Sequence, residues 1–99
     1  MLEKTKLTGQ VRDFTGAAYT GPLTIDLERT AVDQESGFVL AGHHEFNPGA
    51  DGRFELMIWP NARAETETHY LLTAPGLGLR LRLMIPDQPE VDLSEAVVD

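Results

Sequence analysis

The sequence contains no cysteine, and this absence excludes several classes of protein. A disulfide scaffold, a thiolate zinc site and a cysteine nucleophile all require that residue. The absence also fits a reducing compartment. The fold must therefore be stabilised by burial of apolar side chains, which make up 41% of the residues.

Basic residues are scarce, because eight Lys and Arg stand against sixteen Asp and Glu and give a formal net charge of −8. A nucleic-acid groove needs clustered Lys and Arg, and anionic lipid surfaces attract basic segments. No segment approaches the roughly 18 continuous apolar residues of a membrane span. The stretch from Met1 to Lys4 also lacks the apolar run of a signal peptide. We therefore expect no nucleic-acid partner and no membrane partner.

The motifs that carry the chemistry of common enzymes are missing as well. The sequence has no G-x-S-x-G elbow, no P-loop and no H-E-x-x-H zinc site. His43 and His44 are neighbours, so on a strand they face opposite sides and do not enter one metal site. We therefore expect no enzymatic activity, no metal and no other cofactor. A small hydrolase or metal protein built on His43, His44 and His69 is the least favoured alternative.

The clearest structural signal is a strict alternation near the end of the chain. Every odd position from Leu77 to Ile85 is Leu or Ile, whereas Arg80 and Arg82 stand at even positions. Successive side chains of a strand point to opposite faces, so the segment predicts a strand with one apolar face and one basic, solvent-facing side. Weaker alternation or apolar runs predict further strands at 6–12, 23–28, 38–46, 53–58, 69–74 and 91–93.

Turn-forming and polar residues separate these predicted strands. The segment from Asn47 to Gly52 combines Asn, Pro, Gly and Asp, and it predicts a hairpin-like reversal. A calcium loop would need several carboxylates, but Asp51 is the only acid in this segment. Residues 61–68 are polar and have no apolar periodicity, which predicts an exposed loop.

The last residues of the chain form an acidic tail. From Asp87 onward the chain carries five acids and no base, which predicts a solvated end. Ser94 stands where it would cap one helical turn. In an alternative interpretation, the apolar pair Val97 and Val98 docks on another subunit.

Seven short strands in 99 residues predict an all-β fold. We expect one domain over residues 1–99, built as a single antiparallel β-sandwich with Greek-key connections. The strand core covers about residues 5–93 and is followed by the acidic tail at 94–99.

Five short segments follow one another in a characteristic order: Gly9 to Asp13, Gly16, Gly21 to Ile25, Asp51 to Leu56, and Tyr70 to Leu72. This order resembles the transthyretin-like, or prealbumin-like, β-sandwich domains called carboxypeptidase regulatory-like. In that family a G-x-V-x-D strand leads to a loop ending in Gly or Pro, and a D-x-G-x-F hairpin leads to a strand with Tyr. The resemblance covers roughly residues 5–93 and implies a fold rather than an activity.

A narrower resemblance begins at Ile58. This part of the chain is similar to modules of bacteriophage tail and other virion structural proteins. The similarity lies in the run from Ile58 to Asn61, a polar loop, Tyr70, and then Pro86 with the segment from Val91 to Leu93. This implies other virion proteins or copies of the chain as partners. It also implies a place in a virion that assembles in the host cytoplasm, or in the bacterial cytoplasm if the gene lies in a prophage. The transthyretin-like branch that hydrolyses 5-hydroxyisourate ends in Tyr-Arg-Gly-Ser, which this chain lacks.

Four aromatic or sulfur-containing residues and two arginines are candidates for an interaction surface: Trp59, Met57, Tyr19, Tyr70, Arg80 and Arg82. Trp59 is out of phase with the apolar positions of its strand. It therefore either faces outward together with Met57, or covers the end of the sandwich beside Pro60.

The two arginines share one face of their predicted strand. They either pair with Asp26 or Glu28 on a neighbouring strand, or form a basic binding stripe. Because the chain carries an excess of acid, pairing is the simpler interpretation.

From these features we expect a non-enzymatic structural module of a phage or prophage particle, in its tail, baseplate or head decoration. Such a module acts through protein–protein contacts. The alternative is a carbohydrate-binding or adhesion module that recognises glycans through Trp59, Tyr19 and Tyr70.

Overall fold

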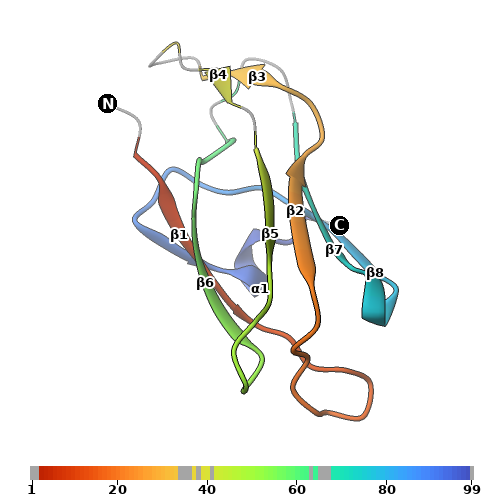
Figure 1. Cartoon of the computed structure of the whole chain (residues 1–99). Helices are drawn as coiled ribbons and strands as arrows, with labels where there is room; N and C mark the ends of the chain where they lie inside the picture. Colours follow the sequence, from red (N-terminus) through yellow and green to blue (C-terminus); the bar gives the residue numbers. More distant parts are fainter. Residues whose placement is uncertain are drawn as a thin grey trace.

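Two β-sheets face one another across a shared apolar core (Figure 1). The structure is a computed structural model, and it describes residues 3–33, 37, 39–40, 42–62, 64 and 68–98. One sheet has three strands in the order β6-β1-β9, and the other has four in the order β5-β2-β7-β8. These strands are β1 Thr5–Gln10, β2 Leu23–Leu27, β5 His43–Phe46, β6 Arg53–Ile58, β7 Tyr70–Ala74, β8 Leu79–Leu83 and β9 Glu90–Asp92. The prediction of a sandwich of seven strands is therefore confirmed.

The remaining elements are short. Strands β3 Ala31–Val32 and β4 Val39–Leu40 form a separate two-stranded sheet at one end of the sandwich, and η1 Pro75–Leu77 and α1 Leu93–Ala96 are single helical turns. The strand predicted at 38–46 is thus divided into β4 and β5, while Phe38 lies outside the described residues. Neither of the helices found in the described ranges is long and apolar enough to span a membrane.

Alternation determines which side chains enter the core. In β2, Leu23 and Ile25 are fully buried, and in β7 the same holds for Leu72. The residues between them face away from the opposite sheet and keep contact with water. Each fully buried side chain of this size contributes about 1.5–3 kcal/mol to folding. The alternation in the sequence therefore predicted the inner faces of both strands correctly.

The three-stranded sheet is mixed, so the prediction of a purely antiparallel sandwich is wrong. β1 pairs with β6 antiparallel but with β9 parallel, with Leu7 opposite Val91. A tight turn joins only antiparallel neighbours, whereas a parallel pair needs a long connection. β9 is separated from β1 by most of the chain and follows β8 of the other sheet, so no turn restricts its direction.

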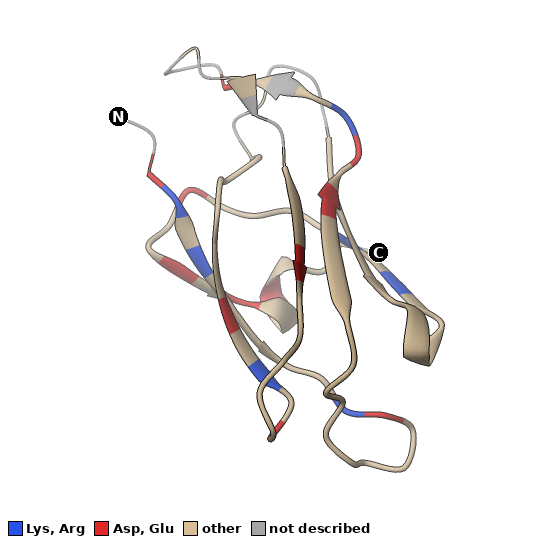
Figure 2. Cartoon of the chain, viewed as in Figure 1, with Lys and Arg blue, Asp and Glu red and all other residues tan. Residues whose placement is uncertain are grey.

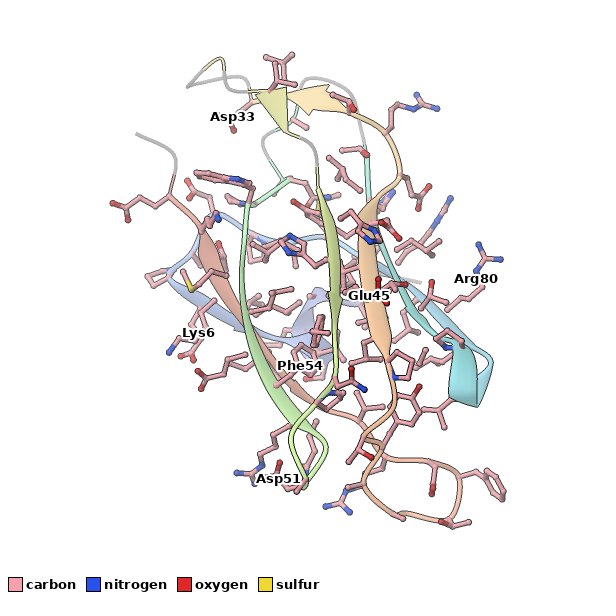
Figure 3. All side chains as sticks on the ribbon, viewed as in Figure 1. Lys6, Asp33, Glu45, Asp51, Phe54 and Arg80 are labelled. Carbon is pink, nitrogen blue, oxygen red and sulfur yellow. The ribbon has the colours of Figure 1, made fainter. Side chains whose placement is uncertain are left out.

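The reversal predicted between 47 and 52 is present at the tip that Figure 3 labels with Asp51, where the chain passes from β5 of one sheet to β6 of the other. The amide of Gly52 donates to the carbonyl of Gly49, and the amide of Gly49 donates to the carbonyl of Arg53. Gly52 has a φ of +80°, and a Cβ at this position would lie 2.4 Å from the carbonyl oxygen of Val11. Only glycine satisfies both conditions without strain.

The two ends of the polar segment after β6 are buried, although its polarity predicts an exposed loop, and residues 63 and 65–67 lie outside the described residues. Asn61 and Thr68 are buried, with exposed fractions of 2% and 3%. The Asn61 side chain donates from Nδ2 to the Thr68 carbonyl at 2.7 Å, and its Oδ1 accepts from the Ile85 amide at 2.7 Å. The buried Asn61 side chain takes the place of water as the hydrogen-bond partner of two backbone groups. A polar residue here therefore links two segments inside the protein and is not a sign of exposure.

The acidic tail is not a freely solvated end. Ala96 is buried, Val97 forms an antiparallel bridge with Leu83, and the Val98 amide donates to the carbonyl of Arg82 at 3.0 Å. The helical turn is capped by Asp92 and not by Ser94, because the Asp92 carboxylate accepts from the Ser94 amide and hydroxyl. The tail therefore docks on the outer edge of β8 in the same chain.

We predict that Asn61→Ala lowers the free energy of unfolding by about 3 kcal/mol, because it leaves two buried backbone groups without partners. The matched control is Asn47→Ala, since Asn47 also donates to a backbone carbonyl, that of Thr20, but is exposed. Water replaces that bond, so the control should cost about 1 kcal/mol or less. Urea unfolding of both variants measures the difference, and equal losses would contradict the internal role of Asn61.

Candidate interaction surface

The most exposed large apolar side chain among the described residues belongs to Phe14, whose exposed fraction is 99%. It lies in the loop between β1 and β2, at the end of the sandwich opposite the β3–β4 sheet (Figure 1). Folding normally removes such a ring from water, and its complete exposure leaves apolar surface that a partner can cover. The sequence pattern predicts only a connection between two strands here, and it does not single out Phe14.

The loop that carries Phe14 is held in shape by Asp13. The Asp13 carboxylate accepts from the Thr15 amide at 2.9 Å, the Thr15 hydroxyl at 2.5 Å and the Ala17 amide at 3.1 Å. The hydrogen bond from the Thr15 hydroxyl is the main cause of a lowered pKa of Asp13. The carboxylate is therefore ionised at neutral pH and supports the turn.

Arg12 and Gly16 complete the same turn. The Arg12 guanidinium donates from Nη1 to the Gly16 carbonyl at 2.8 Å, and Arg12 forms an antiparallel bridge with Ala18. Gly16 has a φ of +89°, which glycine adopts without strain. Phe14 is thus presented by a preorganised loop.

A groove with a volume of ≈ 280 Å³ lies beside this ring. Its walls come from the loop, from η1 and from the first residue of β8: Arg12, Asp13, Phe14, Gly76, Leu77 and Leu79. Leu77 and Leu79 are partly buried and offer apolar surface to the groove. The exposed ring and the groove therefore form one apolar site, which we call the Phe14 site.

A larger groove of ≈ 460 Å³ lies on the three-stranded sheet and is lined by Thr8, Gly9, Gln10, Arg53, Phe54, Glu55 and Asp92. Four of its polar side chains, those of Thr8, Gln10, Arg53 and Asp92, already have partners within the chain. The Thr8 hydroxyl donates to Asp92, the Gln10 amide donates to the Asp51 carbonyl, and Arg53 lies 3.7 Å from the Asp51 carboxylate. This groove offers fewer unsatisfied groups to a ligand than its size suggests.

Tyr19, a candidate for the exposed surface, is buried beneath the Phe14 site. Its hydroxyl donates to the Pro22 carbonyl at 2.9 Å. A Cβ on Gly76 would lie 3.0 Å from that hydroxyl, so the ring packs directly against η1. Tyr19 therefore supports the floor between the loop and η1 instead of meeting a ligand.

Tyr70 is also inside the molecule, with an exposed fraction of 1%. Its hydroxyl donates to the Trp59 carbonyl at 2.7 Å, and burial raises the pKa of the phenol well above its ordinary value. The ring thus joins the start of β7 to the end of β6. It is not available as a surface aromatic.

Trp59 and Met57 lie on the outer side of the three-stranded sheet. Met57 is about half exposed, at 48%, and stands opposite Lys6 of β1. Trp59 is half-buried, and the Lys4 ammonium lies 5.3 Å from the centroid of its ring, within range of a cation–π contact. The ring of Trp59 is therefore half-buried and has the Lys4 ammonium against it.

Arg80 and Arg82 lie on one face of β8, but only Arg82 has an acidic partner in the described part of the chain. Arg82 Nε donates to Glu28 at 3.1 Å, one of the two pairings that the sequence predicts. Asp26, the other predicted partner, contacts Nδ1 of His43 on β5. Figure 2 shows the two arginines as blue segments of β8, and Figure 3 shows Arg80 projecting away from the sandwich.

The histidines are distributed as strand alternation predicts. His43 is exposed beside Asp26, whereas His44 is partly buried on the other face of β5. Within the described ranges, no group of three or more His, Cys, Asp or Glu side chains is arranged to hold a metal ion.

The sequence matches no protein-family model and no curated protein. These comparisons therefore assign no function to the chain.

We predict opposite titration of the two neighbouring histidines. The hydrogen bond that His43 donates to the Asp26 carboxylate raises the pKa of His43 above its ordinary 6.5, and burial lowers the pKa of His44 below that value. An NMR titration of the imidazole protons should show His44 titrating before His43 as the pH rises. Asp26→Asn should move the His43 midpoint down toward 6.5 and leave His44 below it.

The contact between His43 and Asp26 also makes the stability of the fold depend on pH. Protonated His43 stabilises the folded state fully below pH 6.5, and this contribution is lost as the pH rises through its raised folded pKa. Above pH 6.5 the wild type should therefore lose more stability than Asp26→Asn. A His43 midpoint at or below that of His44 would contradict the contact with Asp26.

Proposed function

We propose that this chain is a non-enzymatic assembly module that acts through protein–protein contacts in a phage or prophage particle. The observation that carries the proposal is the complete exposure of Phe14 on a loop held by Asp13. An exposed aromatic ring beside an apolar groove has the chemistry of an interface anchor. Its partners are copies of this chain or other particle proteins.

Preorganisation of the loop makes such a contact favourable. Binding costs free energy whenever a flexible loop or side chain must become ordered. Here Asp13, Arg12 and Gly16 already fix the backbone on both sides of the ring. A partner that covers Phe14 gains the burial of an aromatic side chain, worth about 1.5–3 kcal/mol, with little further ordering.

The family proposed for the chain is the transthyretin-like, carboxypeptidase regulatory-like group. It is supported by the positions of the residues that carry the resemblance, which lie in turns and in the core. Gly52 lies in the tight turn before β6, Gly16 lies in the loop after β1, and Tyr70 enters the core at the start of β7. The place in a phage particle rests on the narrower resemblance from Ile58 to Asn61.

A glycan-binding function draws less support from the same geometry. Sugar stacking needs exposed aromatic faces, but Tyr19 and Tyr70 are buried and Trp59 is covered on one side by Lys4. Sugar binding would require these rings to become exposed, whereas the ring of Phe14 is exposed already.

The proposal is tested by placing a photo-reactive benzophenone derivative of phenylalanine at position 14 in cells that produce the particle. Irradiation should link position 14 to a second polypeptide, and mass spectrometry identifies it as a copy of the chain or another particle protein. Particles purified on a density gradient should contain the linked product. Asp13→Ala in the same background should reduce its yield several-fold, because the loop loses its preorganised shape.

The control carries the same photo-reactive residue at Gln88, which is exposed in the connection between β8 and β9. The proposal fails if position 14 gives no more linked product than position 88. Absence of the protein from purified particles would reject the place in a particle while leaving the contact itself intact.

A further inference from the structure

The outer edge of β8 is only partly covered. β8 ends the order of the four-stranded sheet, and the tail of the chain pairs with its last residues. The Met84 amide donates to the Ala96 carbonyl at 2.9 Å, and the Arg82 carbonyl accepts from the Val98 amide at 3.0 Å. Among the described residues, nothing pairs with this edge between Leu79 and Leu81.

The backbone of Arg80 faces this open part of the edge. In a strand, the N–H and C=O of one residue point to the same side, and the side alternates from residue to residue. The polar groups of Met84 and Arg82 point outward to the tail, so those of Arg80 point outward as well. One donor and one acceptor are therefore available for another strand.

The side chains along this edge have two different chemistries. Leu79 and Leu81 are directed to the sandwich interior but only partly buried, so their apolar surface lies at the open edge. Arg80 is on the opposite face and exposed, and the described residues include no acid paired with it. Leu79 is also a wall of the Phe14 site, so the edge and that site are continuous.

We propose that the edge of β8 at Leu79–Leu81 accepts an extended segment of another protein whose side chains alternate between acidic and apolar. The backbone of the segment pairs with Arg80, its acidic side chains lie beside Arg80, and its apolar side chains cover Leu79 and Leu81 and end in the Phe14 site. This is strand addition to a sheet edge, in which the backbone gives affinity and the alternate side chains give specificity. The inference rests on the proposed function, since it names the partner of that same end of the molecule.

A second copy of β8 does not fit this edge. Two β8 strands paired across a two-fold axis would bring Arg80 of one copy close to Arg80 of the other, and like charges on paired strands are destabilising. A cation on an edge strand is a common way in which proteins avoid pairing with themselves. The same cation attracts an acidic strand, although the chain as a whole carries a net charge of −8.

The test uses a soluble eight-residue peptide in which valine and glutamate alternate, and a matched peptide in which valine and lysine alternate. Backbone amides of the ¹⁵N-labelled full chain are followed by NMR as each peptide is added. With the glutamate peptide at saturation, we expect exchange of the Arg80 amide hydrogen to slow at least tenfold. The lysine peptide should bind at least tenfold more weakly.

Charge reversal makes the test specific. Arg80→Glu should exchange the preference, so that the lysine peptide now protects the amide at position 80. The matched control is Arg53→Glu, which reverses an exposed arginine on β6, an edge strand of the other sheet, and should leave the preference of β8 unchanged. The inference is overturned if neither peptide slows exchange at Arg80 in the wild type, or if Arg80→Glu keeps the original preference.

Failure of this inference and failure of the proposed function are distinguishable. If photo-crosslinking at position 14 succeeds while the Arg80 amide stays unprotected, assembly occurs without strand addition at β8. If the glutamate peptide protects Arg80 while position 14 gives no crosslink, the edge binds a strand but Phe14 is not the assembly anchor. Phe14→Ser should weaken binding of the glutamate peptide several-fold if the bound strand reaches the Phe14 site.

Discussion

The side chain of Asn61 joins the two sheets at one end of the sandwich, and the positions of the neighbouring strands depend on this link. It follows β6 of one sheet and bonds to Thr68 before β7 and to Ile85 after β8, both in the other sheet. Because both bonds are buried, the two sheets cannot separate at this end without exposing unsatisfied backbone groups. Tyr70 adds a second link of the same kind, from its hydroxyl to the Trp59 carbonyl.

With that end fixed, the opposite end is free to present a loop. The loop between β1 and β2 lies at the opposite end of the sandwich from the end of β6, which Asn61 follows (Figure 1). Its shape depends on the local hydrogen bonds that the Asp13 carboxylate accepts and on the buried ring of Tyr19. Substitutions in the loop should therefore change binding without unfolding the core, which makes this end suited to contacts with other molecules.

The two edges of the four-stranded sheet differ in charge and in cover. On β5, His43 lies between Asp26 and Glu45, so that edge is acidic at neutral pH. On β8, Arg82 is paired with Glu28, the tail covers the last residues, and Arg80 stands beside an unpaired stretch of backbone. In the proposed strand addition, Arg80 thus selects the charge of the partner strand, while the backbone supplies the hydrogen bonds.

The sequence alone determined the features that depend on neighbouring residues. Alternation in β2, β7 and β8 sets the inner faces, because successive side chains of a strand point to opposite sides whatever the strand pairs with. The turn at Gly52 follows from local backbone conformation, and the pairing of Arg82 with Glu28 was one of two choices that the charges left open.

Tertiary structure alone decided the features that join distant segments. The parallel pairing of β1 with β9, the burial of Asn61, the docking of the tail on β8 and the burial of the Tyr19 ring all depend on groups brought together by folding. A polar or aromatic residue has the same identity whether water or another segment satisfies it, so its sequence neighbours do not reveal its partner. For the same reason the exposure of Phe14, in a loop between two strands, is decided by the tertiary structure, in which Tyr19, Phe54 and Tyr70 are buried.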